Sequence, residues 1–205
     1  MTNTMTDPPP LFDPDTARGR LLAAAARLFR EKGYAGTTVR DIAGALGILS
    51  GSLFHHFRSK EEILFAVMES VITAMRHDLE AALAAAEAPQ ARVRALIAVE
   101  LAYLHGPASD ATSVLFHDWR ALSSERQAPL LQGRNAYFLL WHNTLAEARA
   151  AGLISLEPEI LRQFLHGALA WTSFWYRPGG ALALDALTDR ALALTLDRPD
   201  PFNPR

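Results

Sequence analysis

The sequence contains no cysteine, so it can form neither disulfide bonds nor thiolate metal sites. It also lacks any run of about 18 apolar residues, the length that a membrane-spanning helix needs. At the N-terminus, Asp7 is followed by three prolines, without the basic and apolar segments of a signal peptide. We therefore expect a cytoplasmic protein with no membrane partner.

The motifs of several enzyme classes are absent as well. There is no glycine-rich phosphate loop, no HExxH motif and no GxSxG motif. His117 beside Asp118 is the one suggestive pair, but neighbours on a helix diverge by about 100° and do not form a relay. The sequence thus predicts no catalytic residue, no cofactor and no metal site, with a helical enzyme as the alternative from another class.

Lysine is scarce, with two residues, and the net charge of −2 alone would argue against nucleic acid. The charges are unevenly distributed, however. Residues 16–60 hold eight basic and two acidic side chains, which leaves 12 basic and 20 acidic for the rest. A basic unit joined to an acidic remainder is typical of a DNA-binding head on a separate body. The alternative is a basic surface with no role in binding.

Residues 38–60 have the pattern of two short helices joined by a glycine turn. Ile42 and Ala43 would share the inner face of the first helix, and Leu53 that of the second. Gly47 stands where the chain must turn with positive φ, which glycine adopts without steric cost. This arrangement predicts a helix-turn-helix, whose second helix enters the major groove of DNA.

The segment from Thr16 to Val71 resembles the DNA-binding domain of TetR-family transcriptional regulators. Five elements occur in the family's order: the entry helix 19–29, the Gly33-Tyr34 stop, Thr37-Thr38-Val39, Leu53-Phe54-His55-His56-Phe57, and the helix start at 59–64. The resemblance implies an all-α fold of about nine helices, with a three-helix head and a helical ligand-binding and dimerisation body.

The rest of the chain also favours an all-α fold, because no segment alternates with period two for long enough to predict a strand. Helices are expected from Asp15 or Thr16 to Lys32, then over about 59–88, 89–104, 109–122, 128–151, 158–176 and 184–196. Ser59 and Glu62 would cap the fourth helix, and Ser109 the sixth. The expected domains are a disordered arm (1–14), the DNA-binding head (15–60), the body (61–196) and a flexible tail (197–205).

Three residues of the head suit DNA phosphates. Thr38 can cap the second helix and offer its hydroxyl beside the positive helix end. Arg40 lies one turn further on, and Lys60 stands where the family places a phosphate-binding lysine. Such contacts position a protein on DNA without selecting a sequence.

Sequence selection is expected from the second helix of the motif, where Ser52 and His55 can reach base edges and Gly51 permits close approach. Leu49 replaces a common capping serine, and Phe54 replaces a tyrosine whose hydroxyl would bind phosphate. Leu49 would either delay the helix start or direct an apolar side chain towards a thymine methyl. The predicted DNA-binding set is Thr38, Arg40, Leu49, Ser50, Gly51, Ser52, Phe54, His55, His56 and Lys60; alternatively, His56 is a buried packing residue.

All four tryptophans lie in the body. Aromatic-lined cavities with a few polar groups are how small-molecule sites are usually built. The predicted ligand-binding set is Phe116, Trp119, Arg120, Arg134, Tyr137, Trp141, Trp171 and Trp175. Alternatively, the rings fill a helical core and the arginines lie on the surface or in ion pairs.

Residues 117–122 and 171–180 are similar to a branch of the family that controls fatty-acid, aromatic or steroid catabolism and senses acyl-CoA thioesters. This resemblance implies an effector of that kind, or another lipid or aromatic catabolite. Arginines facing a pocket would suit its phosphate or carboxylate groups.

The helix expected over 158–176 is apolar almost all round, more than one subunit can bury. It therefore predicts a homodimer, with the interface residues Phe164, Leu165, Ala168, Leu169, Leu187, Ala191 and Leu194. A dimer presents two recognition helices to a palindromic operator in double-stranded DNA. The predicted function is a repressor that a small molecule releases from its operator; the alternative is a regulator with a collapsed pocket that a protein partner controls.

Overall fold

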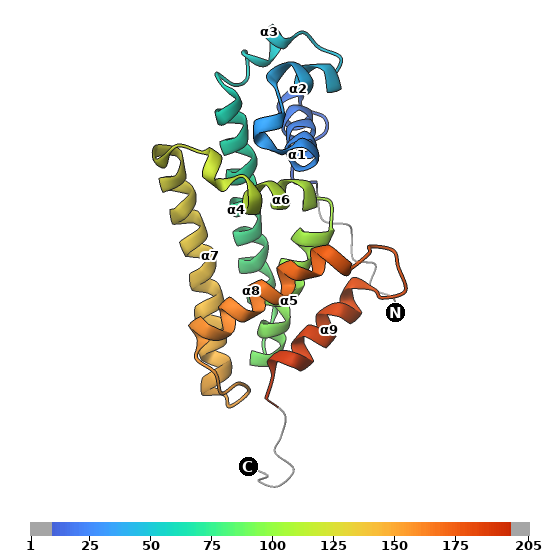
Figure 1. Cartoon of the computed structure of the whole chain (residues 1–205). Helices are drawn as coiled ribbons and strands as arrows, with labels where there is room; N and C mark the ends of the chain where they lie inside the picture. The colour runs from blue at the N-terminus through green and yellow to red at the C-terminus, as the bar shows by residue number, and fades with distance from the viewer. Residues whose placement is uncertain (1–9, 198–205) are drawn as a thin grey trace. The chain divides into compact units, whose positions relative to one another are not determined.

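The computed structural model describes residues 10–197, and its regular structure is entirely helical (Figure 1). In chain order the helices are α1 (Ala17–Gly36), α2 (Val39–Ala45), α3 (Ser50–Leu53), α4 (Lys60–Ala85), α5 (Pro89–His105), α6 (Ser109–His117), the 3₁₀ helix η1 (Trp119–Ala121), α7 (Ser124–Ala150), α8 (Pro158–Trp175) and α9 (Leu184–Thr195). Nine α-helices and no strand in this part of the chain confirm the predicted all-α fold. Within residues 10–197, no helix combines the length and the apolar composition that crossing a membrane requires.

The helices group into two compact units. Within residues 10–197, the first comprises the residues up to 71 together with 107–127, and the second comprises 72–106 and the residues from 128 onwards. The sequence placed a boundary after residue 60, which does not coincide with this division, because α6 packs against α1 and so joins the first unit. Most of the predicted arm and tail, residues 1–9 and 198–205, lies outside the described residues.

The core of the first unit is built on α1. Thr16 caps this helix by accepting a hydrogen bond from the Gly19 N–H at 2.9 Å. The side chains of its predicted inner stripe are all buried: Leu21, Leu22, Ala25, Leu28 and Phe29. Gly33, with φ of 73°, interrupts the helix where the stop was expected, and a single further turn follows.

The two helices of the predicted motif pack against each other. Ile42 and Ala43 of α2 and Leu53 of α3 are buried, and Gly47 between the helices has φ of 67°, as its place in the turn required. α3 is only four residues long. Leu49 stands at its N-cap in an extended conformation and supplies no side-chain hydrogen bond, so the helix begins uncapped.

Three helix starts and ends differ from the sequence pattern. Ala108, not Ser109, is the N-cap residue of α6. The helix ends at His117 because Asp118 leaves the helical conformation and its carboxylate accepts the Tyr34 N–H at 3.2 Å. α7 begins at Ser124, four residues earlier than expected, and includes Pro129. A proline near the start of a helix removes only one hydrogen bond.

α5 is the centre of the second unit and packs against both α8 and α9 (Figure 1). Arg94 on α5 forms ion pairs with Asp185 and Asp189 of α9. Tyr103, two residues before the end of α5, donates its hydroxyl to Asp78 of α4 at 2.7 Å. These contacts hold α5 against α9 and α4.

The turn glycine provides a test of the helix-turn-helix geometry. A Cβ on Gly47 would meet nothing within 4 Å, so Gly47→Ala adds only the strain of positive φ. We expect a loss of about 1–2 kcal/mol in the free energy of unfolding. Gly44→Ala is the matched control, because Gly44 is also unobstructed but lies within α2, where alanine should stabilise by about 0.5–1 kcal/mol. Urea unfolding of both variants measures this; equal effects would contradict the assigned turn.

Candidate nucleic-acid interface and effector site

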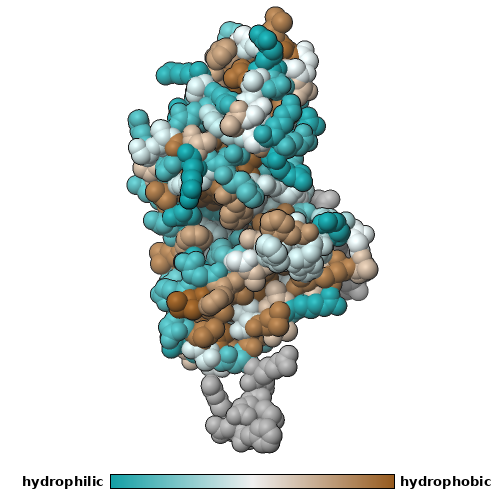
Figure 2. All heavy atoms as spheres, viewed as in Figure 1, coloured by the Kyte–Doolittle hydropathy of each residue, from teal (hydrophilic) through white to brown (hydrophobic). Residues whose placement is uncertain are grey.

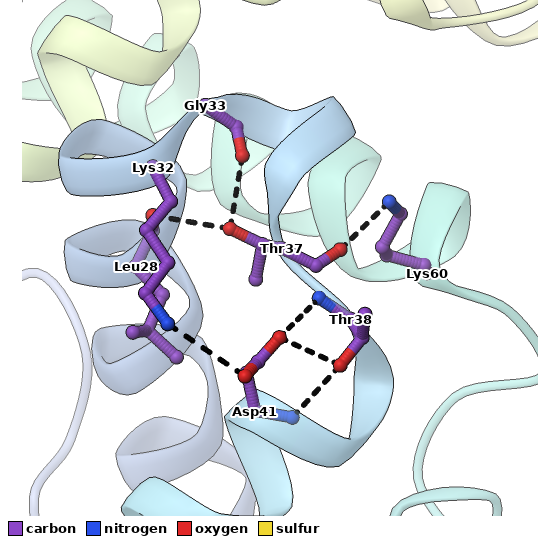
Figure 3. Close-up of polar contacts among 7 residues, drawn as sticks. All are labelled: Leu28, Lys32, Gly33, Thr37, Thr38, Asp41 and Lys60. Carbon is purple, nitrogen blue, oxygen red and sulfur yellow. Dashed lines mark hydrogen bonds and ion pairs between the residues drawn. The ribbon is translucent and has the colours of Figure 1, made fainter.

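A buried threonine organises the junction of α1, α2 and α4 (Figure 3). Thr37 is fully buried, and its hydroxyl lies 3.1 Å from the Leu28 carbonyl oxygen and 2.9 Å from that of Gly33, so one proton is shared between them. Gly33 has non-helical backbone angles, and the Thr37 N–H, which would pair with the Gly33 carbonyl in a continuous helix, instead donates to the Tyr34 carbonyl oxygen at 3.3 Å. The Thr37 hydroxyl therefore gives a hydrogen bond to the backbone where the long part of α1 ends, just before α2 begins.

Lys60, at the start of α4, completes this junction (Figure 3). Its ammonium donates to the Tyr34 and Thr37 carbonyl oxygens, each at 2.8 Å, and lies 4.1 Å from the centre of the Tyr34 ring. An ammonium has three protons, and two are used here. The lysine that the family pattern assigned to phosphate thus has a structural role in the head, with one proton left for another acceptor.

Thr38 and Asp41 form a reciprocal cap at the start of α2 (Figure 3). The Asp41 N–H donates to the Thr38 hydroxyl at 3.1 Å, while that hydroxyl and the Thr38 N–H donate to the Asp41 carboxylate at 2.6 and 2.8 Å. The hydrogen bonds from Thr38, with the nearby Lys32 ammonium, lower the pKa of Asp41. The predicted cap is confirmed, but the hydroxyl proton is committed to Asp41 and is not offered to a phosphate in this conformation.

The other predicted DNA-binding side chains lie around α3. Gly51, His55 and His56 are exposed, and Ser50 and Ser52 are half-buried. The exposure of His56 excludes the alternative that it packs as a buried imidazole. Arg40, on α2, is exposed too. Figure 2 shows hydrophobic atoms over α3, where Leu49 and Phe54 are among the exposed large apolar residues.

Residues 107–127 are tied to the helix-turn-helix part of the first unit by polar contacts. Arg30 of α1 pairs with Asp110 of α6 at 2.6 Å, and the Ser123 N–H donates to the Glu61 carboxylate at 2.8 Å. This N–H, aided by Arg126, lowers the pKa of Glu61. Phe116, Trp119 and Arg120, predicted to bind ligand, lie in this segment and are exposed or half-buried.

The first unit also contains a pocket of about 420 Å³ between α1 and α6. Its polar groups already have partners: Arg30 pairs with Asp110, and the His117 Nδ1 lies 2.8 Å from the Ser113 carbonyl oxygen. None of the predicted ligand-binding residues lines it. Satisfied polar groups make this pocket a poor effector site.

The second unit holds a buried polar cluster that involves α5, α7 and α8. Glu100 of α5 is 1% exposed, and its carboxylate accepts the hydroxyl proton of Tyr137 of α7 at 2.5 Å. Burial, followed by the charge of Glu100, raises the pKa of Tyr137 well above its ordinary value. His166 of α8 brings its Nε2 to 3.9 Å from the same carboxylate oxygen. A buried carboxylate of this kind is costly unless its hydrogen bonds are satisfied.

Three buried side-chain atoms of α7 and α8 form no hydrogen bond of ordinary geometry among the described residues: Nε1 of Trp141, Oγ1 of Thr144 and Nε2 of His166. Trp141 is fully buried, and its ring lies 4.4 Å from that of His166. The Nδ1 of His166 lies 2.9 Å from the Arg162 carbonyl oxygen, so it carries a proton. The Nε2 of a neutral imidazole is then an acceptor, and the indole N–H of Trp141 is a donor. Buried polar atoms are rarely left unpaired, which makes this cluster the candidate effector site.

The predicted ligand-binding set is thus divided by the structure. Tyr137 and Trp141 are buried in the cluster, whereas Trp171 and Trp175 are exposed on the outer face of α8. Arg134 is exposed on α7. Trp171 and Trp175 are four residues apart and lie on the side of α8 that faces away from its own core. Among the described residues, no group of acidic or histidine side chains could hold a metal ion.

α8 has two apolar faces, as its composition suggested. Its inner face is buried within the chain and includes Leu165 and Leu169, which the sequence assigned to the dimer interface. Leu187 of α9 is buried as well. These three leucines pack the subunit's own core, because the face they occupy meets the rest of the second unit. The outer face instead exposes Ile160, Phe164, Ala168, Trp171, Phe174 and Trp175; Leu194 is exposed on α9 and Ala191 is half-buried.

Comparison with known protein families shows to which family the chain belongs. The family described as bacterial regulatory proteins, tetR family, matches residues 21–67, and the tetracyclin repressor-like C-terminal domain matches residues 86–198. The chain belongs to the TetR family. The first match covers the helix-turn-helix and the second covers most of the second unit.

Similar proteins and solved structures match nearly the whole chain. The transcriptional repressor KstR2 of Rhodococcus jostii is 33% identical over 198 residues, 93% of this chain and 96% of that protein. The solved ketosteroid transcriptional regulator KstR2 of Mycobacterium tuberculosis is 27% identical, with a TM-score of 0.80 over 91% of this chain and 97% of that one. A crystal structure of the superantigen pfit is 47% identical, with a TM-score of 0.79 over 91% and 92%.

These matches establish a transcriptional repressor of the TetR type that uses a helix-turn-helix, and they confirm the prediction that the chain is not an enzyme. Members of the family bind operator DNA, dimerise and bind small-molecule effectors.

Sequence reasoning missed Thr37 as an organiser of the TetR head, and Glu100 and His166 as members of the buried cluster. Glu100 did leave a signal. It stands at the spacing of the buried positions Val93, Leu96 and Ile97, so an acid occupies the apolar face of α5. Thr37 left no such signal, because its partners come from the break at Gly33.

The lysine junction leads to a stability test with a natural control, because the chain has only two lysines. Lys60→Met keeps the aliphatic stem but leaves the Tyr34 and Thr37 carbonyls without their donor. We expect a loss of about 1–3 kcal/mol in the free energy of unfolding. Lys32→Met removes only an exposed ion pair with Asp41, 3.6 Å away, and should change stability little. Chemical denaturation distinguishes the two; equal losses would show that the Lys60 junction is not structural.

Proposed function

We propose that this TetR-type protein acts in the cytoplasm as a homodimeric repressor, which leaves a palindromic operator when a small molecule binds the second unit. The observation that carries the proposal is the pairing of a complete helix-turn-helix, with an exposed α3, and a buried cluster with unpaired polar atoms. One unit thus supplies a DNA-reading surface and the other a place where a ligand gains hydrogen bonds.

DNA recognition in this proposal uses the exposed surface around α3. Ser50, Ser52, His55 and His56 supply donors and acceptors for base edges, while Gly51 permits close approach of the backbone. Arg40 contacts a phosphate, and the third proton of Lys60 is available for another.

Three further residues of the predicted set make no polar contact with DNA in this proposal. Thr38 supports binding by fixing the start of α2, since its hydroxyl proton is held by Asp41. Leu49 and Phe54 contribute apolar contacts.

The effector is proposed to enter the cluster of Glu100, Tyr137, Trp141 and His166. A polar oxygen of the ligand would accept from the Trp141 N–H, and a hydroxyl would also donate to the His166 Nε2. The acidic Glu100 disfavours a carboxylate at this end. An acyl-CoA thioester with an oxygen-bearing ring system fits these conditions, and the ketosteroid regulator among the relatives supports that class. Arg134, two turns before Trp141 on α7, suits the phosphates of coenzyme A.

Release would follow from differential affinity. An effector that favours the non-binding spacing of the two heads by about 3 kcal/mol lowers operator affinity by more than a hundredfold. Phe116, Trp119 and Arg120 belong to the first unit and are not part of the site proposed in the second unit.

The dimer is proposed to form through the outer face of α8 and Leu194 of α9. The exposed Ile160, Phe164, Ala168, Trp171 and Trp175 repeat every three or four residues, so they form one continuous stripe. Exposed apolar stripes of this length are typical of self-complementary interfaces.

The function is tested by enriching duplexes from a random pool with the full-length protein and measuring affinity at fixed salt. We expect a palindromic site bound at least a hundredfold more tightly than random DNA. Addition of steroid-derived and fatty acyl-CoA thioesters should weaken binding by at least tenfold, and Trp141→Phe should reduce that response without changing affinity in their absence. Affinity within tenfold of random DNA would refute the repressor. A specific site with no response to any thioester would favour control by a protein partner instead.

The dimer is tested by Phe164→Glu, which places a charge at the centre of the stripe. We expect monomers at micromolar concentration and loss of palindrome binding, measured by analytical ultracentrifugation and by titration of the enriched duplex. Leu139→Glu is the matched control, because Leu139 is exposed on α7 outside the stripe. A Phe164→Glu protein that stays dimeric would move the interface elsewhere.

A further inference from the structure

The tip of the first unit exposes more apolar surface than a reader of polar base edges requires. Leu49 is 81% exposed, Phe54 56% and Ile48 40%. These residues lie immediately before and after the four residues of α3, and Figure 2 shows the hydrophobic atoms gathered over that helix. The polar side chains of α3 itself, Ser50 and Ser52, are half-buried between them.

The side chain of Leu49 has no role within its own chain. The Leu49 carbonyl accepts the Ser52 N–H at 2.9 Å, but its side chain supplies no cap to α3, where serine, threonine, aspartate or asparagine would satisfy an N–H. Its side chain is also outside the core, which Leu53 and Phe57 complete. A residue that neither caps nor packs, at the first position of a helix that reads DNA, is placed for contact with the DNA.

Major-groove chemistry restricts what that contact can be. The base edges in this groove present hydrogen-bonding groups, and the C5 methyl of thymine is the apolar group among them. Residues at the N-terminal end of a recognition helix are the ones that meet base edges. A leucine there can only gain free energy by removing apolar surface from water, which a thymine methyl allows and a cytosine edge does not.

We propose that Leu49 is a specificity-determining residue that selects thymine in each operator half-site through its C5 methyl group. The inference rests on the proposed function, since it needs the protein to bind a specific duplex. Ile48 and Phe54 flank this contact and exclude water from it, while Ser52 and His55 read neighbouring base edges by hydrogen bonding.

The test removes single methyl groups from the DNA. In the duplex enriched by the wild-type protein, each thymine is replaced in turn by deoxyuridine, which keeps base pairing and lacks only the methyl. We expect wild-type affinity to fall about fourfold at one thymine position of each half-site, the effect of one buried methyl group. Leu49→Ala should bind the thymine and uracil duplexes equally at that position.

Leu49→Ser distinguishes loss of this contact from loss of folding. Serine restores a capping hydroxyl at the start of α3, so this variant should unfold at the same or a higher urea concentration than the wild type. It should nevertheless be insensitive to the thymine methyl. Leu139→Ala, exposed on α7, is the control for removal of a surface leucine and should keep the fourfold discrimination.

Two results would overturn the inference and leave the repressor function intact. One is wild-type affinity that is unchanged by uracil at every position of the enriched duplex. The other is a Leu49→Ser protein that still distinguishes thymine from uracil as the wild type does. Failure to enrich any duplex would instead refute the proposed function itself.

Discussion

The DNA-reading head depends on a single ammonium group. Lys60 donates to the carbonyls of Tyr34 and Thr37, and the Thr37 hydroxyl in turn bonds the carbonyls of Leu28 and Gly33. These bonds fix the end of α1, the start of α2 and the start of α4 relative to one another. Because the turn and α3 follow α2 directly, the exposed surface of α3 is positioned by a junction that lies outside α3 itself.

In the second unit, the buried acid Glu100 connects helices as the buried Thr37 does in the first unit. Glu100 gathers Tyr137 and His166 from two other helices around α5. A polar cluster in an apolar interior is stable only when its hydrogen bonds are satisfied, and three buried polar atoms of α7 and α8 form none of ordinary geometry among residues 10–197. The proposed effector site rests on this cluster.

In both units, the apolar residues of one segment divide into buried and exposed ones. On α8, the leucines of one face complete the core, while the aromatic residues of the other face are exposed. Around α3, Leu53 is buried and Leu49 is not. In both places, apolar residues that are close in sequence differ in burial, and only the exposed ones are available to a partner.

The sequence by itself determined the features that act over a few residues. The stop at Gly33, the turn at Gly47 and the Thr38 cap follow from backbone conformation and local hydrogen bonds, so they were predictable, as were the TetR resemblance and the helical fold. The tertiary structure alone decided which face of α8 is buried, that Lys60 binds two carbonyls, and that Glu100 meets Tyr137. The reason is distance along the chain, since Lys60 and Tyr34 are 26 residues apart and Glu100 and Tyr137 are 37 apart. Partners so far apart are chosen by packing, which local periodicity does not encode.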